Sequence, residues 1–225
     1  GWWNLYCPYF SWGRSLYRNI QRFLYFQLIV NLTALLLVVG GAFIGTYMPL
    51  TVTQILWVNL IMDTFAAMAL ASLPPSKDVL KEMPRKQSDF IISKEMLRGI
   101  LTNGVSFFII LFSMLCYYGS EASKGITTHE LTIFFTTFVM IQLWNLFNAK
   151  TFGCKDSAFS HLKQSKGLLF VFLIVLIGQW LIVSFGGKMF RTEPLSLTEW
   201  GVIIALTSLV LWVEELKRLW NRRTK

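Results

Sequence analysis

Charged residues are scarce in this sequence of 225 residues. Only 15% of the residues are charged and 54% are hydrophobic, whereas about 25% of an ordinary soluble domain is charged. This composition excludes a disordered or collagen-like chain, because such chains contain too few apolar residues to form a core. It also argues against a soluble globular enzyme.

Motifs of soluble enzymes and metal sites are missing as well. The three cysteines, Cys7, Cys116 and Cys154, have no metal-ligand spacing, and their odd number argues against a disulfide framework. His129 and His161 have no cysteine or histidine partner nearby in the sequence, which argues against a zinc site. Neither Gly-x-x-x-x-Gly-Lys-Ser/Thr nor Gly-x-Ser-x-Gly occurs, so no nucleotide loop or hydrolase nucleophile is visible.

Long apolar stretches dominate the chain instead. A spanning helix needs about 20 mostly apolar residues, and six stretches qualify: residues 23–44, 50–73, 97–118, 131–148, 168–185 and 197–219. We therefore predict an all-α, polytopic membrane helix bundle with six transmembrane helices. Residues 1–22 are expected to form a cytoplasmic N-terminal segment and stalk, residues 23–220 the six-helix domain, and residues 221–225 a cytoplasmic tail.

The net charge of +9 could indicate a nucleic-acid partner, but the predicted spans divide the basic residues by side. Of the 21 Lys and Arg residues, 18 lie on one side of the six spans and three, Lys124, Lys188 and Arg191, lie on the other. Because Lys and Arg favour cytoplasmic loops, we predict that both termini are cytoplasmic, with Lys81 and Lys225 on that side. We expect the lipid bilayer as a partner and no nucleic acid.

Asp63 is the one acidic residue predicted in the middle of a span, since the other eleven lie in predicted loops, the tail or helix ends. A carboxylate there costs about 2.5–3.5 kcal/mol on insertion scales, so it usually has a function. Asn59 lies four residues earlier, which places both side chains on one face of a regular helix. Gln27 and Asn31 have the same spacing in the first span.

These polar residues are predicted to lie at one depth. A rise of 1.5 Å per residue places Asn31, Asp63 and Gln142 about 10–13 Å from the cytoplasmic face of a core about 30 Å thick. Carboxylate and amide oxygens suit a hard cation such as calcium, although calcium takes 6–8 oxygen ligands. Interhelical hydrogen bonding is the alternative; we expect it for Asn145, Asn148 and Gln179, and for Gln142 the two interpretations are balanced.

Several of these residues belong to a longer pattern. The run Leu56-Trp57-Val58-Asn59-Leu60-Ile61-Met62-Asp63-Thr64, with Pro74-Pro75 after it, resembles the sixth transmembrane helix of P-type calcium-transporting ATPases. The run Phe26-Gln27-Leu28-Ile29-Val30-Asn31 resembles their fifth helix, and Phe138-Val139-Met140-Ile141-Gln142-Leu143-Trp144-Asn145 resembles their eighth. The resemblance extends from about Trp12 to the tail, and implies that the six spans are the fifth to tenth helices of such a pump.

Three positions indicate the plasma-membrane type of pump. Ala34, Met62 and Gln142 stand where the reticulum type has a glutamate, a threonine and a glutamate. The resemblance implies one calcium site instead of two, with Asp63 and Asn59 as ligands, Asn31 nearby, and Gln142 and Gln27 as further candidates. It also implies a location in the plasma (inner) membrane and calcium as the transported ion.

The family's phosphorylation motif, Asp-Lys-Thr-Gly-Thr, does not occur in this chain. We therefore expect that the chain alone neither hydrolyses ATP nor pumps, and that ATP and magnesium act only in the full-length pump, whose missing helices and cytoplasmic headpiece are its partners. Residues 1–11 do not resemble the segment expected before the fifth helix, which suggests a truncated, frame-shifted or excised chain. A non-catalytic membrane scaffold or assembly module and a pump for another cation are the alternatives.

Overall fold

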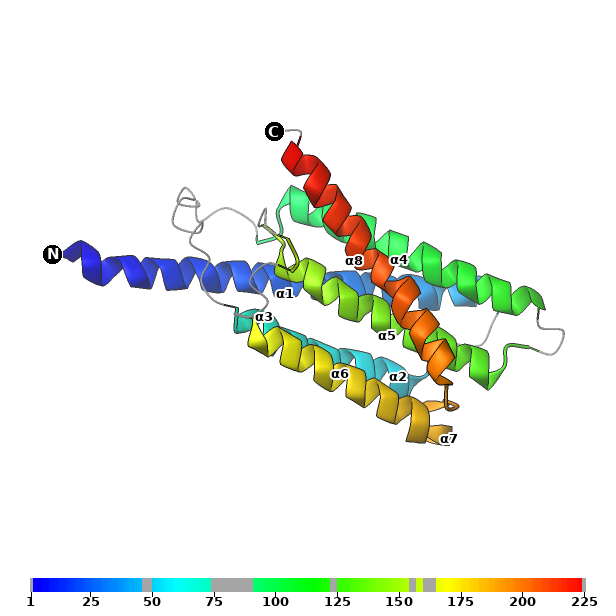
Figure 1. The fold of residues 1–225 in the computed structure, drawn as a ribbon. Helices are drawn as coiled ribbons and strands as arrows, with labels where there is room; N and C mark the ends of the chain where they lie inside the picture. Colours follow the sequence, from blue (N-terminus) through cyan, green and yellow to red (C-terminus); the bar gives the residue numbers. More distant parts are fainter. Residues whose placement is uncertain are drawn as a thin grey trace.

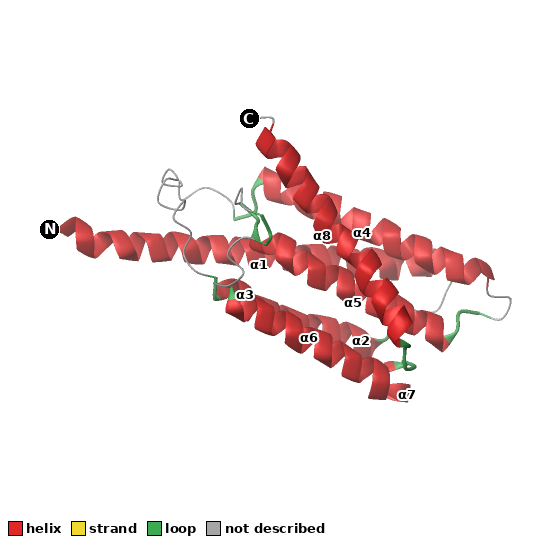
Figure 2. Cartoon of the chain, viewed as in Figure 1, coloured by secondary structure: helices red, strands yellow, loops and turns green. Residues whose placement is uncertain are grey.

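The computed structural model describes residues 2–45, 50–73, 91–121, 125–153, 157–159 and 165–223. Side chains of residues 2–12, 60–62, 121 and 221–223 are not described. The predictions for Pro74, Pro75, Lys81, Lys124, His161 and Lys225 therefore concern residues outside the described part. Within the described part the chain is helical with short connections and no strand (Figure 2). The predicted all-α bundle is confirmed.

Six helical segments in the described residues are long and apolar enough to cross a membrane. They are formed by α1 (Trp2–Ile44), by α2 (Val52–Leu56) continued through the π-helix η1 (Trp57–Met62) and α3 (Asp63–Ala71), by α4 (Lys94–Glu121), by α5 (Thr128–Lys150), by α6 (Lys166–Phe185) and by α8 (Leu197–Arg223). A short helix, α7 (Gly187–Phe190), follows α6. The predicted spans fall inside these segments or within a few residues of their ends.

Two of these helices begin at threonine caps. Thr51 accepts a hydrogen bond from the backbone N–H of Gln54, whose side chain accepts one from the Thr51 N–H in return. Thr127 and Glu130 form the same reciprocal pair before α5. Each capping box satisfies two backbone donors that a helix start otherwise leaves unpaired, so α2 and α5 have defined beginnings.

α1 is much longer than a span. Its 43 residues extend about 65 Å at 1.5 Å per residue, against a hydrocarbon core of about 30 Å. Its N-terminal end projects from the bundle on the side where the C-terminus also lies (Figure 1). The continuous helix therefore joins the predicted stalk to the first span without a break.

Interhelical contacts give the relative direction of two pairs of spans. Gln27 of α1 contacts Asp63 of α3 while Asn19 reaches the Leu73 carbonyl, so these two helices are antiparallel. Trp144 and Asn148 of α5 bond to positions 207 and 210 of α8, so these helices are parallel. This arrangement agrees with six alternating passes, with both termini at one end of the bundle (Figure 1).

Glycines allow α1 and α4 to approach closely. Tyr25 and Leu32 of α1 lie over Gly99 and Gly104 of α4, where an added Cβ would come within 2.9 and 2.7 Å of their side chains. In the other direction, Phe112 of α4 lies over Gly40 of α1, at 2.7 Å from an added Cβ. Small residues at such contacts are typical of packed membrane helices.

α5 lies at the centre of the bundle and is buried along most of its length.

Candidate cation site

The second span carries the candidate site on an irregular segment. Asn59 lies inside the six-residue π-helix η1, and Asp63 is the first residue of α3 after it. A π-helix replaces i→i+4 hydrogen bonds by i→i+5 bonds, and short π segments are frequent at functional sites. The spacing argument for Asn59 and Asp63 assumed a regular helix, so their relation in space is set by η1 instead.

Asp63 contacts one residue of the predicted set. Gln27 Nε2 of α1 donates a hydrogen bond of 3.3 Å to Asp63 Oδ2. The other oxygen, Oδ1, is buried and has no hydrogen-bond partner in the described part of the chain. An unpaired buried carboxylate oxygen is costly, so Oδ1 marks a position where a cation, a proton or water would lower the free energy.

Asn31 and Asn59 differ in exposure. The Asn31 side chain is exposed and the Asn59 side chain is half-buried. Within the described residues neither side chain makes a hydrogen bond, so both amide oxygens are available as ligands. The structure thus brings Gln27 and Asp63 into direct contact, whereas Asn31 and Asn59 are joined to Asp63 by no direct hydrogen bond.

Two amides on α5 lie in the interior of the bundle. Gln142 and Asn145 are fully buried, and neither the oxygen nor the nitrogen of either side chain has a partner in the described part of the chain. Leaving a buried donor or acceptor unpaired costs about 1–3 kcal/mol, and such groups often bind water or an ion. The hydrogen bond expected for Asn145 is therefore absent among these residues, and Asn145 joins Gln142 as a polar group without a structural partner.

The other two amides expected to link helices do so. Asn148 Nδ2 donates to the Val210 carbonyl (3.4 Å), and Arg218 donates to Asn148 Oδ1 (3.0 Å). Gln179 of α6 accepts from the indole N–H of Trp57 (3.1 Å) and donates to Thr136 Oγ1 (3.5 Å). The prediction of interhelical hydrogen bonding is confirmed for Asn148 and Gln179.

Trp57 joins η1 to α6 by contacts that the sequence did not reveal. It is the first residue of η1, and its ring lies over Gly178 of α6, where an added Cβ would be 2.5 Å from Cη2. Together with the hydrogen bond to Gln179, this contact holds the start of the segment that carries Asn59. In the sequence, Trp57 is one of several tryptophans within predicted spans, and such residues suit packing or an interfacial belt. No neighbouring residue distinguishes Trp57 from the other tryptophans.

No group of three or more His, Cys, Asp or Glu residues that could hold a metal ion occurs among the described residues. A cation near Asp63 would therefore depend on one carboxylate together with amide oxygens, backbone carbonyls and water. This donor set contains only oxygen, which suits calcium or magnesium better than zinc or copper. It is too small to complete a calcium shell of 6–8 oxygens.

Comparison with known proteins assigns the family. The family described as "Cation transporting ATPase, C-terminus" matches residues 47–220, which is more than half of the chain and includes the second to sixth spans. The chain belongs to this family. The six helices that are long and apolar enough to cross a membrane indicate that this part of the protein is an integral membrane domain.

Several plasma membrane calcium-transporting ATPases resemble this cation-transporting ATPase domain. Type 2 from Oreochromis mossambicus is 37% identical over 229 residues, which cover 95% of this chain and 20% of the relative. Human type 3 is 37% identical over 202 residues (84% and 16%), and mouse type 1 is 32% identical over 225 residues (95% and 18%). The resemblance to plasma-membrane calcium pumps is confirmed. The chain spans a fifth or less of the length of these relatives.

Proposed function

We propose that this chain forms part of the intramembrane calcium site and transport path of a P-type pump. Asp63, Asn59 and Asn31 are the proposed ligands, and Gln27 and Gln142 are further candidates. The observation that carries the proposal is the Asp63 carboxylate, which lies within a span and has one buried oxygen without a hydrogen-bond partner among the residues that the structure describes. The names of the similar pumps support calcium as the transported ion.

Gln27 has an orienting role in this proposal. Its amide N–H bonds one carboxylate oxygen of Asp63, which restricts rotation of the carboxylate and leaves Oδ1 as the oxygen that binds the cation. The exposed side of α1 that carries Asn31 would face the remaining helices of the pump, which complete the ligand shell. Gln142 and Asn145 supply unpaired amide groups elsewhere in the interior.

The catalytic steps belong to the rest of the pump in this proposal. Because the sequence has no Asp-Lys-Thr-Gly-Thr motif, the chain alone forms no phosphoenzyme, and ATP and magnesium act on the other domains. Phosphorylation there would switch access to the site from one side of the membrane to the other. The domain resides in the plasma (inner) membrane with both termini in the cytoplasm, as the distribution of Lys and Arg predicts.

The test is calcium-dependent phosphoenzyme formation in the full-length pump. Asp63→Asn keeps the shape of the side chain and removes its charge, and calcium affinity depends on the charge of the ligands. We expect the calcium concentration for half-maximal phosphorylation to rise at least about tenfold, which corresponds to about 1.4 kcal/mol. Asn59→Ala should raise this calcium concentration less, since the substitution removes one neutral oxygen. Gln142→Ala should raise it least of the three variants.

Glu95→Gln is the matched control, because Glu95 is an exposed carboxylate at the start of α4. It should leave the calcium dependence unchanged. If Asp63→Asn also leaves the calcium dependence unchanged in a correctly inserted protein, the site assignment is wrong and the Gln27–Asp63 hydrogen bond only links α1 to α3.

A further inference from the structure

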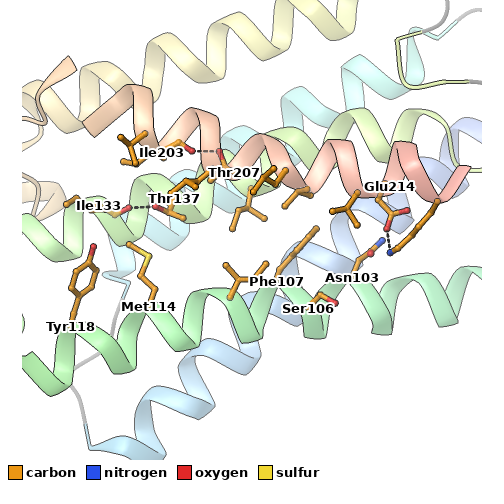
Figure 3. Close-up of a pocket in the computed structure, with 18 residues that line it drawn as sticks. Asn103, Ser106, Phe107, Met114, Tyr118, Ile133, Thr137, Ile203, Thr207 and Glu214 are labelled. Carbon is orange, nitrogen blue, oxygen red and sulfur yellow. Dashed lines mark hydrogen bonds and ion pairs between the residues drawn. The ribbon is translucent and has the colours of Figure 1, made fainter. Parts of the chain in front are cut away.

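Hydroxyl side chains in the middle of α5 have hydrogen-bond partners. Thr136 Oγ1 accepts a hydrogen bond from Gln179 Nε2 of α6 (3.5 Å). Figure 3 shows Thr137 Oγ1 bonded to a backbone carbonyl of its own helix (2.8 Å). Gln142 and Asn145 differ from these threonines, because both side chains are fully buried and none of their four polar atoms has a partner among the described residues.

We propose that Gln142 and Asn145 together bind one ordered water molecule inside the bundle. The proposal does not depend on calcium binding at Asp63. It differs from the function proposed above only in the role of Gln142, which binds water here instead of the cation.

The spacing of the two residues suits a shared ligand. Gln142 and Asn145 are three positions apart on α5, so their side chains lie on one face of the helix, with Cβ atoms about 5–6 Å apart. A water molecule with hydrogen bonds of about 2.8–3.0 Å to each of two groups joins atoms that are separated by a similar distance. One water can therefore bridge both amides.

The helix that pairs with other polar residues of α5 lies on a different face. Trp144 Nε1 donates to Thr207 Oγ1 of α8 (3.1 Å), and Asn148 Nδ2 donates to the Val210 carbonyl of α8 (3.4 Å). With 3.6 residues per turn, the face that carries the two unpaired amides is rotated by about 110° from the face that carries these two donors. The hydrogen bonds to α8 therefore do not extend to the two unpaired amides.

The unpaired atoms determine the kind of ligand. Each amide presents one oxygen, which accepts hydrogen bonds, and one NH₂ group, which donates two. A cation would bind only the oxygens and leave the donors unpaired, whereas an anion would bind only the donors. Water donates and accepts, so it can pair with atoms of both kinds. This reasoning holds for either assignment of oxygen and nitrogen within each amide, because both atoms are unpaired.

The charge and the number of the available groups also favour water. An ion buried without an opposite charge is far more costly than a buried neutral group, and both side chains here are neutral. No group of three or more His, Cys, Asp or Glu residues that could hold a metal ion occurs in the part of the chain that the structure describes. A buried water makes about three hydrogen bonds, and the oxygens and NH₂ groups of two amides are sufficient to supply them.

The direct test is cryo-electron microscopy of the full-length pump in lipid nanodiscs, at a resolution that shows ordered water, with calcium and with a calcium chelator. We expect a density peak at about 2.7–3.2 Å from one polar atom of each amide under both conditions. A peak that disappears with the chelator would identify a cation and refute the proposal. Two amides that bond to each other or to another part of the pump, with no peak between them, would also refute it.

Asn145→Leu gives a second test, with Asn148→Leu as the matched control on the same helix. Each substitution replaces an amide by an apolar side chain with the same branching, and Asn148→Leu removes hydrogen bonds to Val210 and Arg218. If water pairs with Asn145, Asn145→Leu should also lower the midpoint of thermal unfolding in detergent, by about 1–6 °C. A midpoint that rises in Asn145→Leu and falls in Asn148→Leu would mean that the Asn145 amide has no ligand, and would refute the proposal.

Gln142→Leu tests whether the two amides share one water. Either single substitution removes a partner of the same water molecule, so the shifts of the two single variants should not add. The double variant Gln142→Leu/Asn145→Leu should therefore have a smaller shift of the midpoint than the sum of the single shifts. Additive shifts would contradict a shared site.

Discussion

The contact between Trp57 and Gly178 allows a quantitative test of how the candidate site is held. In Gly178→Ala the new Cβ would lie 2.5 Å from Trp57 Cη2 and 2.9 Å from Cζ2, so the indole ring or α6 must move. Overpacking of this kind typically costs about 1–3 kcal/mol. Alanine is the better helix former by up to about 1 kcal/mol, and the net effect should be a loss of about 0–3 kcal/mol.

Gly201→Ala is the matched control, because a Cβ at position 201 of α8 meets nothing within 4 Å. This variant should gain only the higher helix propensity of alanine, which is worth up to about 1 kcal/mol. The two variants should therefore differ by about 1–3 kcal/mol. At about 2–4 °C per kcal/mol for a domain of 150–250 residues, their midpoints of thermal unfolding in detergent should lie about 2–12 °C apart.

The calcium dependence of phosphorylation in the full-length pump gives a second readout of the same variant. Displacement of Trp57 moves the start of η1, which carries Asn59, so Gly178→Ala should weaken calcium binding while Gly201→Ala does not. Equal midpoints and equal calcium dependence in the two variants would refute the idea that α6 positions η1.

Two other predictions concern the hydrogen bonds of Glu215 and the topology. Glu215 is buried and accepts hydrogen bonds from the Ala158 N–H (3.1 Å) and Arg218 Nη1 (2.8 Å). Glu215→Ala should therefore lower the free energy of unfolding by about 1.5–3 kcal/mol. An unchanged midpoint of thermal unfolding would contradict this role of Glu215. Positions 166 and 188 flank α6. Single cysteines are placed there in a protein whose Cys7, Cys116 and Cys154 are replaced by serine. The cysteine at position 166 should react with impermeant maleimide from the cytoplasmic side, and the cysteine at position 188 from the outer side. Labelling of both from one side would refute the six-span topology.

The sequence predicted the spans well because a lipid environment imposes a strong and simple requirement. A helix must be apolar for about 20 residues to cross the core, and this requirement set the ends of α4, α5 and α6 to within a few residues. Asp63 was identified for the same reason, since a carboxylate in a span is costly and therefore informative.

Features that depend on tertiary contacts were not predictable in this way. The π-helix at Trp57–Met62 has no local signal, and the contact of Trp57 with Gly178 and Gln179 joins residues more than 120 positions apart. Asn145 and Asn148 are the same residue type on one helix. Among the described residues, Asn148 has hydrogen-bond partners in α8 and Asn145 has none. Whether an amide has a hydrogen-bond partner depends on the helix packed against it. The sequence of α5 does not indicate which helix that is.

The interlocked glycines of α1 and α4 limit how this bundle can change shape. Tyr25 and Leu32 fit into the surface of α4 while Phe112 fits into the surface of α1, so sliding either helix along its axis would drive these side chains into the backbone of its neighbour. We therefore expect the two helices to move together. Any motion that opens or closes the region around Asp63 has to occur between this pair and the helices on its other side, where α3 meets α1. Substitutions at the α1–α4 contact should be tolerated only as compensating pairs, such as a larger residue at Gly104 together with a smaller one at Leu32.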